Sequence, residues 1–335
     1  MSGFSRRVMP VAMAIAVAVV VGDLLILSVG QSPGTVYRLL LDGTWGNPYG
    51  VAQVVYKATT LTFTGLAVAV AMQAGMFNIG AESQLAAGGF AAGAVGMVLP
   101  ASVPGVVAVV LLLGAAAVGG AVVGAIPGAL VARYGANEVI TTIMLNFIVL
   151  AFLNWAVAAH LHVPETLHTP GLVTGTVARF YPGAAANWTA VVALVVAAGV
   201  GWYVFGTRAG MALRAVGLAP EAAEYAGIPT GRVRLAAFAL AGAIAGVGGT
   251  NFVLGNKHYY EDGFAGGAGF IGIAVALAGG GRPVGIVVAA LAFATLSQGG
   301  LAIHAVVPKQ MVDVMQAVVI LVVVAATPEV RRMLR

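Results

Sequence analysis

Residues 104–131 read PGVVAVVLLLGAAAVGGAVVGAIPGALV, a run of apolar and small residues without a charged side chain. A run of 18 or more such residues is long enough to cross the hydrocarbon layer of a membrane as a helix. Within it, Gly120, Gly124 and Gly128 recur every four residues and therefore share one helix face. Small residues at this spacing let two helices approach closely in a membrane. The segment predicts a spanning helix whose glycine face packs on another helix.

The composition of the whole chain also indicates a membrane protein. Of its 335 residues, 60% are hydrophobic and only 8% are charged, whereas a typical soluble domain is about 25% charged. The mean hydropathy is +1.00, and a water-soluble fold is excluded. The net charge of +5 does not indicate nucleic acid binding, because the basic residues stand singly or in pairs between apolar runs. The chain has no cysteine, which excludes disulfides and thiolate metal sites.

Apolar runs of similar length recur along the chain. At some 20 residues for each helical crossing, they make about ten spans. The runs cover residues 8–30, 51–72, 83–100, 104–131, 138–159, 187–206, 233–254, 265–281, 284–304 and 310–327. We therefore expect an all-α fold, a polytopic transmembrane helical bundle formed as one domain by residues 1–335. Further glycines four apart, Gly89 with Gly93 and Gly242 with Gly246, predict helix contacts within it.

The distribution of basic residues predicts the orientation of the bundle. Most of the 16 Lys and Arg residues fall in alternate connections between the runs. Because inside loops carry an excess of basic residues, both termini are expected to face the cytoplasm. Lys57 falls near the outer end of the run 51–72, from where its stem can reach the headgroups. The long outside connections 31–50 and 160–186 are expected to shape an outer vestibule.

A cluster of polar side chains interrupts the apolar pattern at residues 76–84, which read MFNIGAESQ. A carboxylate at the bilayer centre costs about 2.5 to 3.5 kcal/mol on insertion scales, so Glu82 should face a cavity or a helix break. One interpretation is a broken or re-entrant helix that lines a substrate path. The other is a cytoplasmic turn capped by Asn78, with Glu82 next to the dipole of the span that it begins. The residues alone favour neither.

A second polar set lies on one face of a predicted helix, where Glu138, Thr142 and Asn146 stand four residues apart. Asn146 is about two turns inside the apolar region, so its amide needs a partner. That partner is either a neighbouring helix, the commoner role of a single intramembrane asparagine, or the substrate.

The basic connection 206–232 contains a short helix with both ends marked. In PEAAEYAGIP (220–229), Pro220 suits the first helical position and Gly227 the position just beyond the end. The helix is shorter than the roughly 12 to 15 residues that an isolated helix needs, so burial against something must hold it. It lies on its own bundle or the headgroups, or it docks into another protein.

No enzyme signature is present in the sequence. A Walker A loop needs Gly-Lys followed by Ser or Thr, but none of the lysines follows a glycine. No Gly-x-Ser-x-Gly elbow supplies a nucleophile. His160 and His162, with Glu165 and His168, fall in one outside loop. Nothing fixes a ligand geometry there, so we expect solvated histidines and no metal site.

Four ordered motifs resemble a known family. They are Phe77-Asn78-Ile79-Gly80-Ala81-Glu82, the stretch from Glu138 to Asn146, the loop from Gly206-Thr207-Arg208 to Gly227-Ile228, and Gly269-Phe270-Ile271-Gly272-Ile273-Ala274-Val275-Ala276-Leu277. In this order they resemble permease subunits of bacterial ABC importers. The most similar are nucleoside permeases, within the larger group of simple-sugar and branched-chain amino-acid permeases. The resemblance runs from about residue 50 to the C-terminus.

The resemblance implies that several chains share the work of transport. Glu221, Ala222, Ala223 and Gly227 would form a coupling helix that seats in a groove of a separate ATP-binding subunit. ATP and Mg²⁺ would bind that partner, and this chain would bind no cofactor and catalyse no reaction. A second permease, expected to be a different chain, would complete the pore, and an extracytoplasmic binding protein or lipoprotein would deliver the substrate. The implied location is the bacterial cytoplasmic (inner) membrane.

We therefore expect the transmembrane permease of an ATP-driven nucleoside importer. Polar residues of its path would hydrogen-bond ribose or base edges, and aromatic residues would stack on the base. The expected path residues are Phe77, Asn78, Glu82, Gln84, Asn146 and Phe147. Permeases for simple sugars or branched-chain amino acids are the nearest alternatives. A secondary transporter without an ATPase is the rival from another class, and it would use Asp23 and Glu82 as titratable groups.

Overall fold

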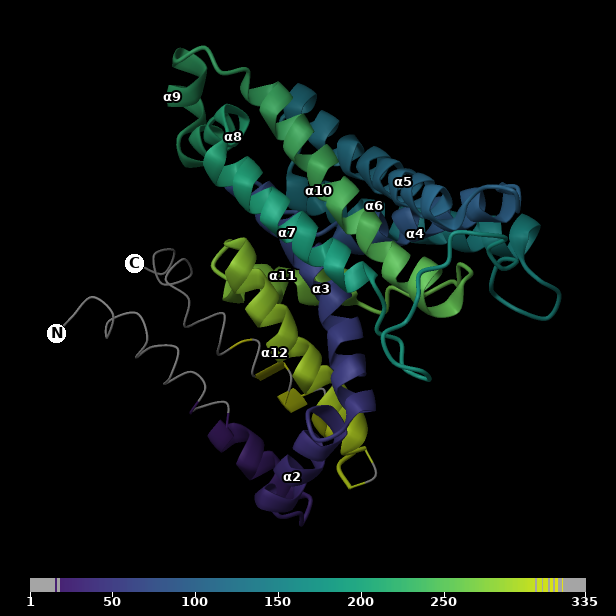
Figure 1. The fold of residues 1–335 in the computed structure, drawn as a ribbon. Coiled ribbons are helices and arrows are strands. Elements are labelled where there is room, and N and C mark those ends of the chain that lie inside the picture. Colours follow the sequence, from purple (N-terminus) through teal and green to yellow (C-terminus); the bar gives the residue numbers. More distant parts are fainter. Residues whose placement is uncertain are drawn as a thin grey trace.

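The structure is a computed structural model that describes residues 16, 19–304, 306–308, 310–312, 314–315, 317–318 and 321. A first helix, Val19–Ser28, precedes the labelled ones. The others are α2 (Pro33–Thr44), α3 (Pro48–Gln73), α4 (Ala81–Val98), α5 (Gly105–Tyr134), α6 (Glu138–Ala156), α7 (Thr189–Gly206), α8 (Arg208–Leu218), α9 (Pro220–Tyr225), α10 (Thr230–Phe252), α11 (Ala268–Ala278) and α12 (Pro283–Ala302). The π-helical turns η1 (Val157–Leu161) and η2 (Val253–Lys257) extend α6 and α10. Because the described residues contain no strand, the predicted all-α class is confirmed (Figure 1).

Six helices of the described part are long and apolar enough to cross a membrane, which confirms a multi-pass bundle. They are α3, α5, α6 with η1, α7, α10 with η2, and α12. A seventh span results if Val19–Ser28 and α2, which meet at an angle of 110°, form one broken crossing. The expected count of about ten crossings is not confirmed.

Two of the expected spans fall short for physical reasons. Helix α4 begins with Glu82, Ser83 and Gln84, which make its first turn polar. Helix α11 has 11 residues, which at 1.5 Å per residue reach only about 16 Å, half the thickness of the hydrocarbon layer. The run 310–327 lies largely outside the described residues. Apolar composition alone did not separate these two helices from full crossings.

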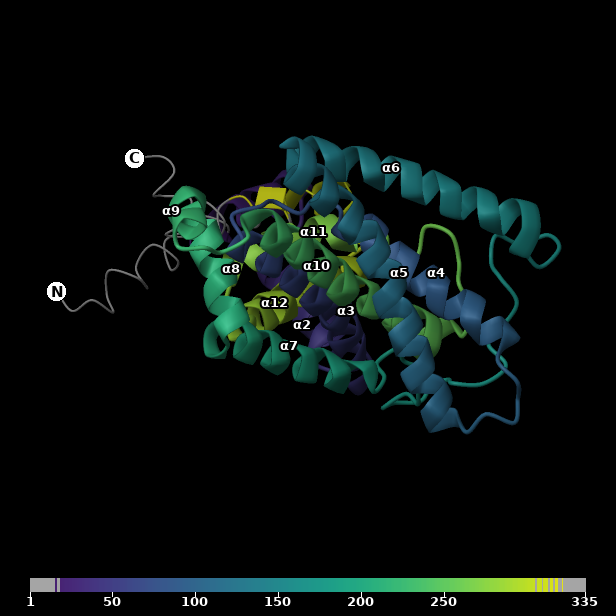
Figure 2. The same cartoon turned by 90° about the horizontal axis from the view of Figure 1, so that it is seen from above.

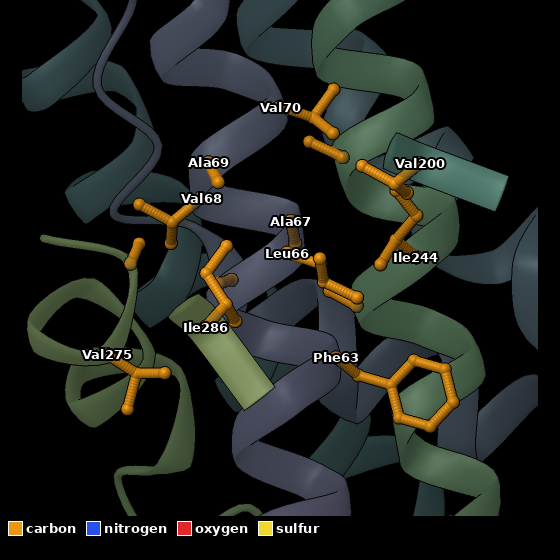
Figure 3. Close-up of a cluster of buried hydrophobic side chains, with 14 of the residues drawn as sticks. Phe63, Leu66, Ala67, Val68, Ala69, Val70, Val200, Ile244, Val275 and Ile286 are labelled. Carbon is orange, nitrogen blue, oxygen red and sulfur yellow. The ribbon is translucent and has the colours of Figure 1, made fainter. Parts of the chain in front are cut away.

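Helix α3 forms the centre of the bundle (Figure 1). Its second half is buried on every face, which requires a helix that is apolar all round. Figure 3 shows Phe63 and Leu66 of α3 among side chains from the surrounding helices. Those neighbours are Val200 of α7, Ile244 of α10, Val275 of α11 and Ile286 of α12.

The other helices are arranged around this centre. Figure 2 shows α6 along one side and α7 along the opposite side, with α3, α10, α11 and α12 between them. Helices α2 and α9 lie at opposite ends of the molecule (Figure 1). The short helix α9 therefore stands at one end of the bundle.

The predicted glycine face of α5 is confirmed by its packing on α10. A Cβ added to Gly120 would collide with the carbonyl oxygen of Gly242, and one added to Gly124 would collide with that of Phe238. A Cβ on Gly128 would lie 2.9 Å from the Cβ of Phe238. These contacts bring two backbones together as expected for small residues in membrane helices.

The pair Gly89 and Gly93 has the expected helix neighbour, since a Cβ added to Gly249 of α10 would lie 2.6 Å from the nitrogen of Gly89, but a connection covers the pair as well. A Cβ added to Gly89 would lie 2.8 Å from the ring of Phe264, and one added to Gly93 would lie 3.0 Å from the Cβ of Tyr260. Both neighbours belong to the connection between α10 and α11. Spacing by four predicted a crowded face correctly, but it could not show that a folded connection covers this face.

The contact between α5 and α10 predicts that one substitution destabilises the protein at one glycine of α5 and not at another. Gly120→Ala should destabilise the protein by about 2 kcal/mol, because neither backbone can retreat from the added methyl group. Gly114→Ala is the matched control in the same helix, since nothing lies within 4 Å of an added Cβ there. The thermal midpoint in detergent or nanodiscs measures both. An equal midpoint for the two variants would contradict the packing.

Candidate functional site

A sharp turn joins α3 to α4 and buries an amide pair. Gly75 adopts a φ of +72° at the end of α3, where a side chain would be strained. Asn78 then donates from Nδ2 to Oε1 of Gln84 (2.9 Å), and Gln84 Nε2 donates back to Asn78 Oδ1 (3.1 Å). Asn78 Oδ1 also accepts from the backbone N–H of Gly80 (3.0 Å). Both side chains are fully buried, so this exchange satisfies amides that water cannot reach.

Asn146 holds the same turn from the side of α6. Its Nδ2 donates to the carbonyl oxygen of Ile79 (2.9 Å), and its Oδ1 accepts from the backbone N–H of Ser83 (3.1 Å). The expectation that its amide needs a partner is confirmed, and the partner is the start of α4. Thr142, one turn earlier, bonds to the carbonyl oxygen of Glu138 in its own helix (2.6 Å).

The carboxylate of Glu82 joins the starts of two helices. It lies in the first turn of α4, as expected, but it faces the start of α11 rather than the dipole of its own helix. Oε1 accepts from the backbone N–H of Gly267 (2.8 Å), and Oε2 accepts from that of Gly269 (2.6 Å). An anion at a helix start satisfies free N–H groups and interacts favourably with the dipole. A Cβ on Gly269 would collide with the backbone of Glu82, so only glycine permits this approach.

The structure therefore gathers four of the six expected path residues into one polar junction. We use this name for Asn78, Glu82, Gln84 and Asn146 with the starts of α4 and α11. Phe77 is half-buried in the turn between α3 and α4. Phe147 lies apart, because it follows Asn146 on α6 and points away with 69% of its surface exposed.

A cavity that the sequence did not reveal lies beside the polar junction. Its volume is about 250 Å³, and Tyr56, Thr60 and Leu61 of α3 contribute to its wall together with residues of α10, α11, α12 and the connection before α11. Lys57 also lines it and donates from Nζ to Oγ of Ser297 (3.2 Å). Lys57 lies nine residues into α3, about 14 Å along the axis, and its bond turns the ammonium group toward α12. No local pattern in the sequence indicated this pairing, because the two residues are 240 positions apart.

The short helix expected at 220–227 is confirmed. Helix α9 begins at Pro220 and ends at Tyr225, and Gly227 follows with a φ of +82°. Ala223 is buried, whereas Tyr225 is 94% exposed. Glu221, Ala222, Glu224 and Gly227 are exposed as well. One residue of α9 thus faces the bundle, and most of its surface is uncovered.

Helix α8 connects α9 to the turn at the end of α3. A Cβ added to Gly217 of α8 would collide with the carbonyl oxygen of Gln73 and lie 2.8 Å from the nitrogen of Gly75. Gln73 also donates from Nε2 to the carbonyl oxygen of Gly281 between α11 and α12 (3.5 Å). The end of α3 is therefore in contact with both α8 and the loop that follows α11.

These features together define a class of protein. A multi-pass bundle contains two helices, α4 and the half-length α11, whose starts meet inside it, a cavity beside them and an uncovered short helix at one end. This is the architecture of a membrane permease. Among the described residues, no group of three His, Asp or Glu side chains is placed to hold a metal ion.

Comparison with known proteins gives the family. Residues 50–324 match the family described as branched-chain amino acid transport system / permease component. The chain belongs to this family. It is a permease subunit and a multi-pass membrane protein.

Three relatives resemble nearly the whole chain. The guanosine ABC transporter permease protein of Bacillus subtilis is 34% identical, over 93% of this chain and 92% of the relative. The nucleoside ABC transporter permease protein of Lactococcus lactis is 31% identical, over 89% and 85%. The glucose ABC transporter permease protein of Haloferax volcanii is 32% identical, over 94% and 86%. No solved structure matches the chain.

The bonds of Glu82 predict a loss of stability when its charge is removed. Glu82→Gln keeps one carbonyl acceptor but turns an NH₂ group toward the second backbone N–H. Hydrogen bonds to a charged group contribute about 1.5 to 3 kcal/mol, and a loss of this size should lower the thermal midpoint. Glu165→Gln, in an exposed loop position, is the control and should leave the midpoint unchanged. A Glu82→Gln protein as stable as the wild type would show that the carboxylate is not the link between α4 and α11.

Proposed function

We propose that this chain is the transmembrane permease of an ATP-driven importer for nucleosides. Family membership supports the permease role, and the names of two relatives support the substrate, since one is a guanosine permease and the other a nucleoside permease. The observation that carries the ATP-driven mechanism is the exposed helix α9. The chain would lie in the bacterial cytoplasmic membrane with both termini inside, as the basic residues indicate.

The coupling step is assigned to α9. In this proposal, a separate ATP-binding subunit binds the short segment formed by Glu221, Ala222, Ala223 and Gly227. That subunit also binds ATP and Mg²⁺. Six helical residues are too few to persist alone in water. Tyr225, at 94% exposure, gives the helix an uncovered aromatic anchor, a residue type enriched at interface hot spots.

The movement would reach the transport path through α8. The close approach of Gly217 to Gln73 leaves no space for the two segments to slide independently. A shift of α9 and α8 would therefore move the end of α3 and, beyond it, the turn that carries Asn78. In this proposal Phe77, Asn78, Glu82, Gln84 and Asn146 lie along the path, and Phe147, which points away from them, does not. A second permease chain completes the pore, and an extracytoplasmic binding protein delivers the nucleoside.

Specific observations bear on two alternatives, a simple-sugar substrate and a proton-driven mechanism. The glucose permease relative keeps a simple-sugar substrate as the second candidate. A transporter driven by protons would need Glu82 to change its charge. Protonation would remove the acceptor for one of the two backbone N–H groups that the carboxylate now binds, so the geometry favours a permanent charge at this position.

Uptake by cells that express the importer tests the proposed function. Uptake of labelled adenosine in cells that carry this chain and its partner subunits should require ATP hydrolysis by the partner. Unlabelled guanosine should compete, whereas ribose and leucine should not. Competition by ribose alone would overturn the nucleoside assignment. Accumulation by this chain without any ATPase subunit, driven by a proton or sodium gradient, would overturn the ATP-driven mechanism.

The glycine after α9 provides a test of coupling. Gly227→Val places a β-branched residue at a φ of +82°, which should disturb the end of α9 and lower uptake per ATP hydrolysed at least severalfold. Gly183→Val is the control, because Gly183 has a φ of +80° and open space around it but lies in the loop before α7. The ratio of transport to ATPase rate in proteoliposomes measures the effect. Equal ratios for the two variants would remove α9 from the coupling step.

A further inference from the structure

The cavity beside the polar junction has an unusual balance of hydrogen-bonding groups. Its polar wall consists of the hydroxyls of Tyr56, Thr60 and Ser297 and the ammonium group of Lys57. Each hydroxyl already accepts a bond. Tyr56 Oη accepts from Asn256 Nδ2 (3.2 Å), Thr60 Oγ1 accepts from Asn251 Nδ2 (2.9 Å), and Ser297 Oγ accepts from Lys57 (3.2 Å).

The protons of these hydroxyls are not used within the described part of the chain. Three neighbours of Thr60 on α3, the residues Thr59, Thr62 and Thr64, donate to backbone carbonyls of their own helix. Thr60 makes no such bond among the described residues, and neither does Ser297. A hydroxyl that accepts one bond still has a proton to donate. The cavity therefore offers donors and should favour a ligand that presents acceptors.

Lys57 adds the strongest donor to this wall. It lies near the middle of a membrane-spanning helix and is half-buried. In the part of the chain that the structure describes, no carboxylate pairs with it, and Ser297 Oγ is its hydrogen-bond partner. An ionisable side chain at this depth is costly, and such residues mark substrate pathways in membrane proteins. With one N–H bonded to Ser297, the ammonium group has two more N–H donors.

The rest of the wall is aromatic and apolar. Phe252 and Phe264 stack on each other with ring centroids 4.8 Å apart, and both line the cavity with Phe293 and Ile271. Flat apolar faces suit the stacking of a nucleobase. The volume of about 250 Å³ is slightly smaller than the usual lower limit of about 300 Å³ for small-ligand sites. It therefore suits a ligand no larger than a single nucleoside.

We propose that this cavity is a nucleoside site in which Lys57 Nζ and Ser297 Oγ donate to the O6 and N7 edge of a purine, and that it favours 6-oxopurine nucleosides over adenosine. Lysine donates to both acceptors on this edge of guanine, whereas adenine presents an amino donor at position 6. The inference rests on the proposed function, because it concerns the choice among nucleosides. It adds Lys57 and Ser297 as specificity-determining residues.

Inosine and adenosine provide the sharpest comparison, since their bases differ at position 6. Initial uptake of each is measured with the intact importer carrying wild-type chain or Lys57→Met. For each nucleoside, the variant's kcat/KM is divided by that of the wild type, so the contribution of the common binding protein cancels. We expect the inosine value to fall about tenfold and the adenosine value to change less than about twofold.

A matched control is available in the same chain. Lys257→Met removes the same charge from an exposed residue outside the cavity and should leave both quotients near one. The amount of ATPase subunit that co-purifies with each variant reports assembly. If Lys57→Met lowers assembly, Ser297→Ala replaces it, and a smaller loss selective for inosine is expected.

The outcomes separate the inference from the proposed function. An equal loss for inosine and adenosine, or no loss for either, in a fully assembled importer would overturn the role of Lys57 while leaving nucleoside transport intact. A wild-type importer that takes up neither nucleoside would overturn the proposed function and the site together.

Discussion

The absence of water in the hydrocarbon layer is the constraint on which this structure depends. A helix that starts inside the bundle exposes backbone N–H groups, and each must find a partner within the protein. Glu82 supplies partners for two of these groups at the start of α11, while Asn146 accepts from the start of α4. The starts of α4 and α11 can therefore meet in the interior without leaving the described N–H groups of Gly267, Gly269 and Ser83 unpaired.

This junction determines what the neighbouring parts can do. The bonds from Asn78, Glu82 and Asn146 fix the starts of α4 and α11 relative to α6. Glycines on α5 and α10 hold those helices at backbone contact, and such interfaces have little freedom to deform gradually. By contrast, α9 is joined to the bundle through α8 and through one buried side chain, Ala223. The structure thus combines a firmly bonded interior with a largely uncovered helix at one end.

Local patterns in the sequence predicted much of this structure. Apolar runs gave the helical class, the glycine series gave the contact between α5 and α10, and Pro220 with Gly227 gave both ends of α9. The count of spans was not recoverable in the same way, because α4 has the length of a span without an apolar first turn, and α11 is apolar without the length. Pairings between distant segments were also hidden. Nothing local connects Glu82 with Gly267, or Lys57 with Ser297, since folding brings each pair together from far apart in the chain.

The central claim is that the ATP-binding partner subunit binds α9. The chain contains no cysteine, so Tyr225→Cys creates one reactive site on α9, and Tyr181→Cys creates one in the loop before α7. In the assembled importer, a short thiol crosslinker should join the chain to its ATP-binding subunit from position 225 but not from position 181, and the yield should change when ATP is bound. A transport-competent importer in which position 225 never crosslinks to a nucleotide-hydrolysing subunit would contradict the account.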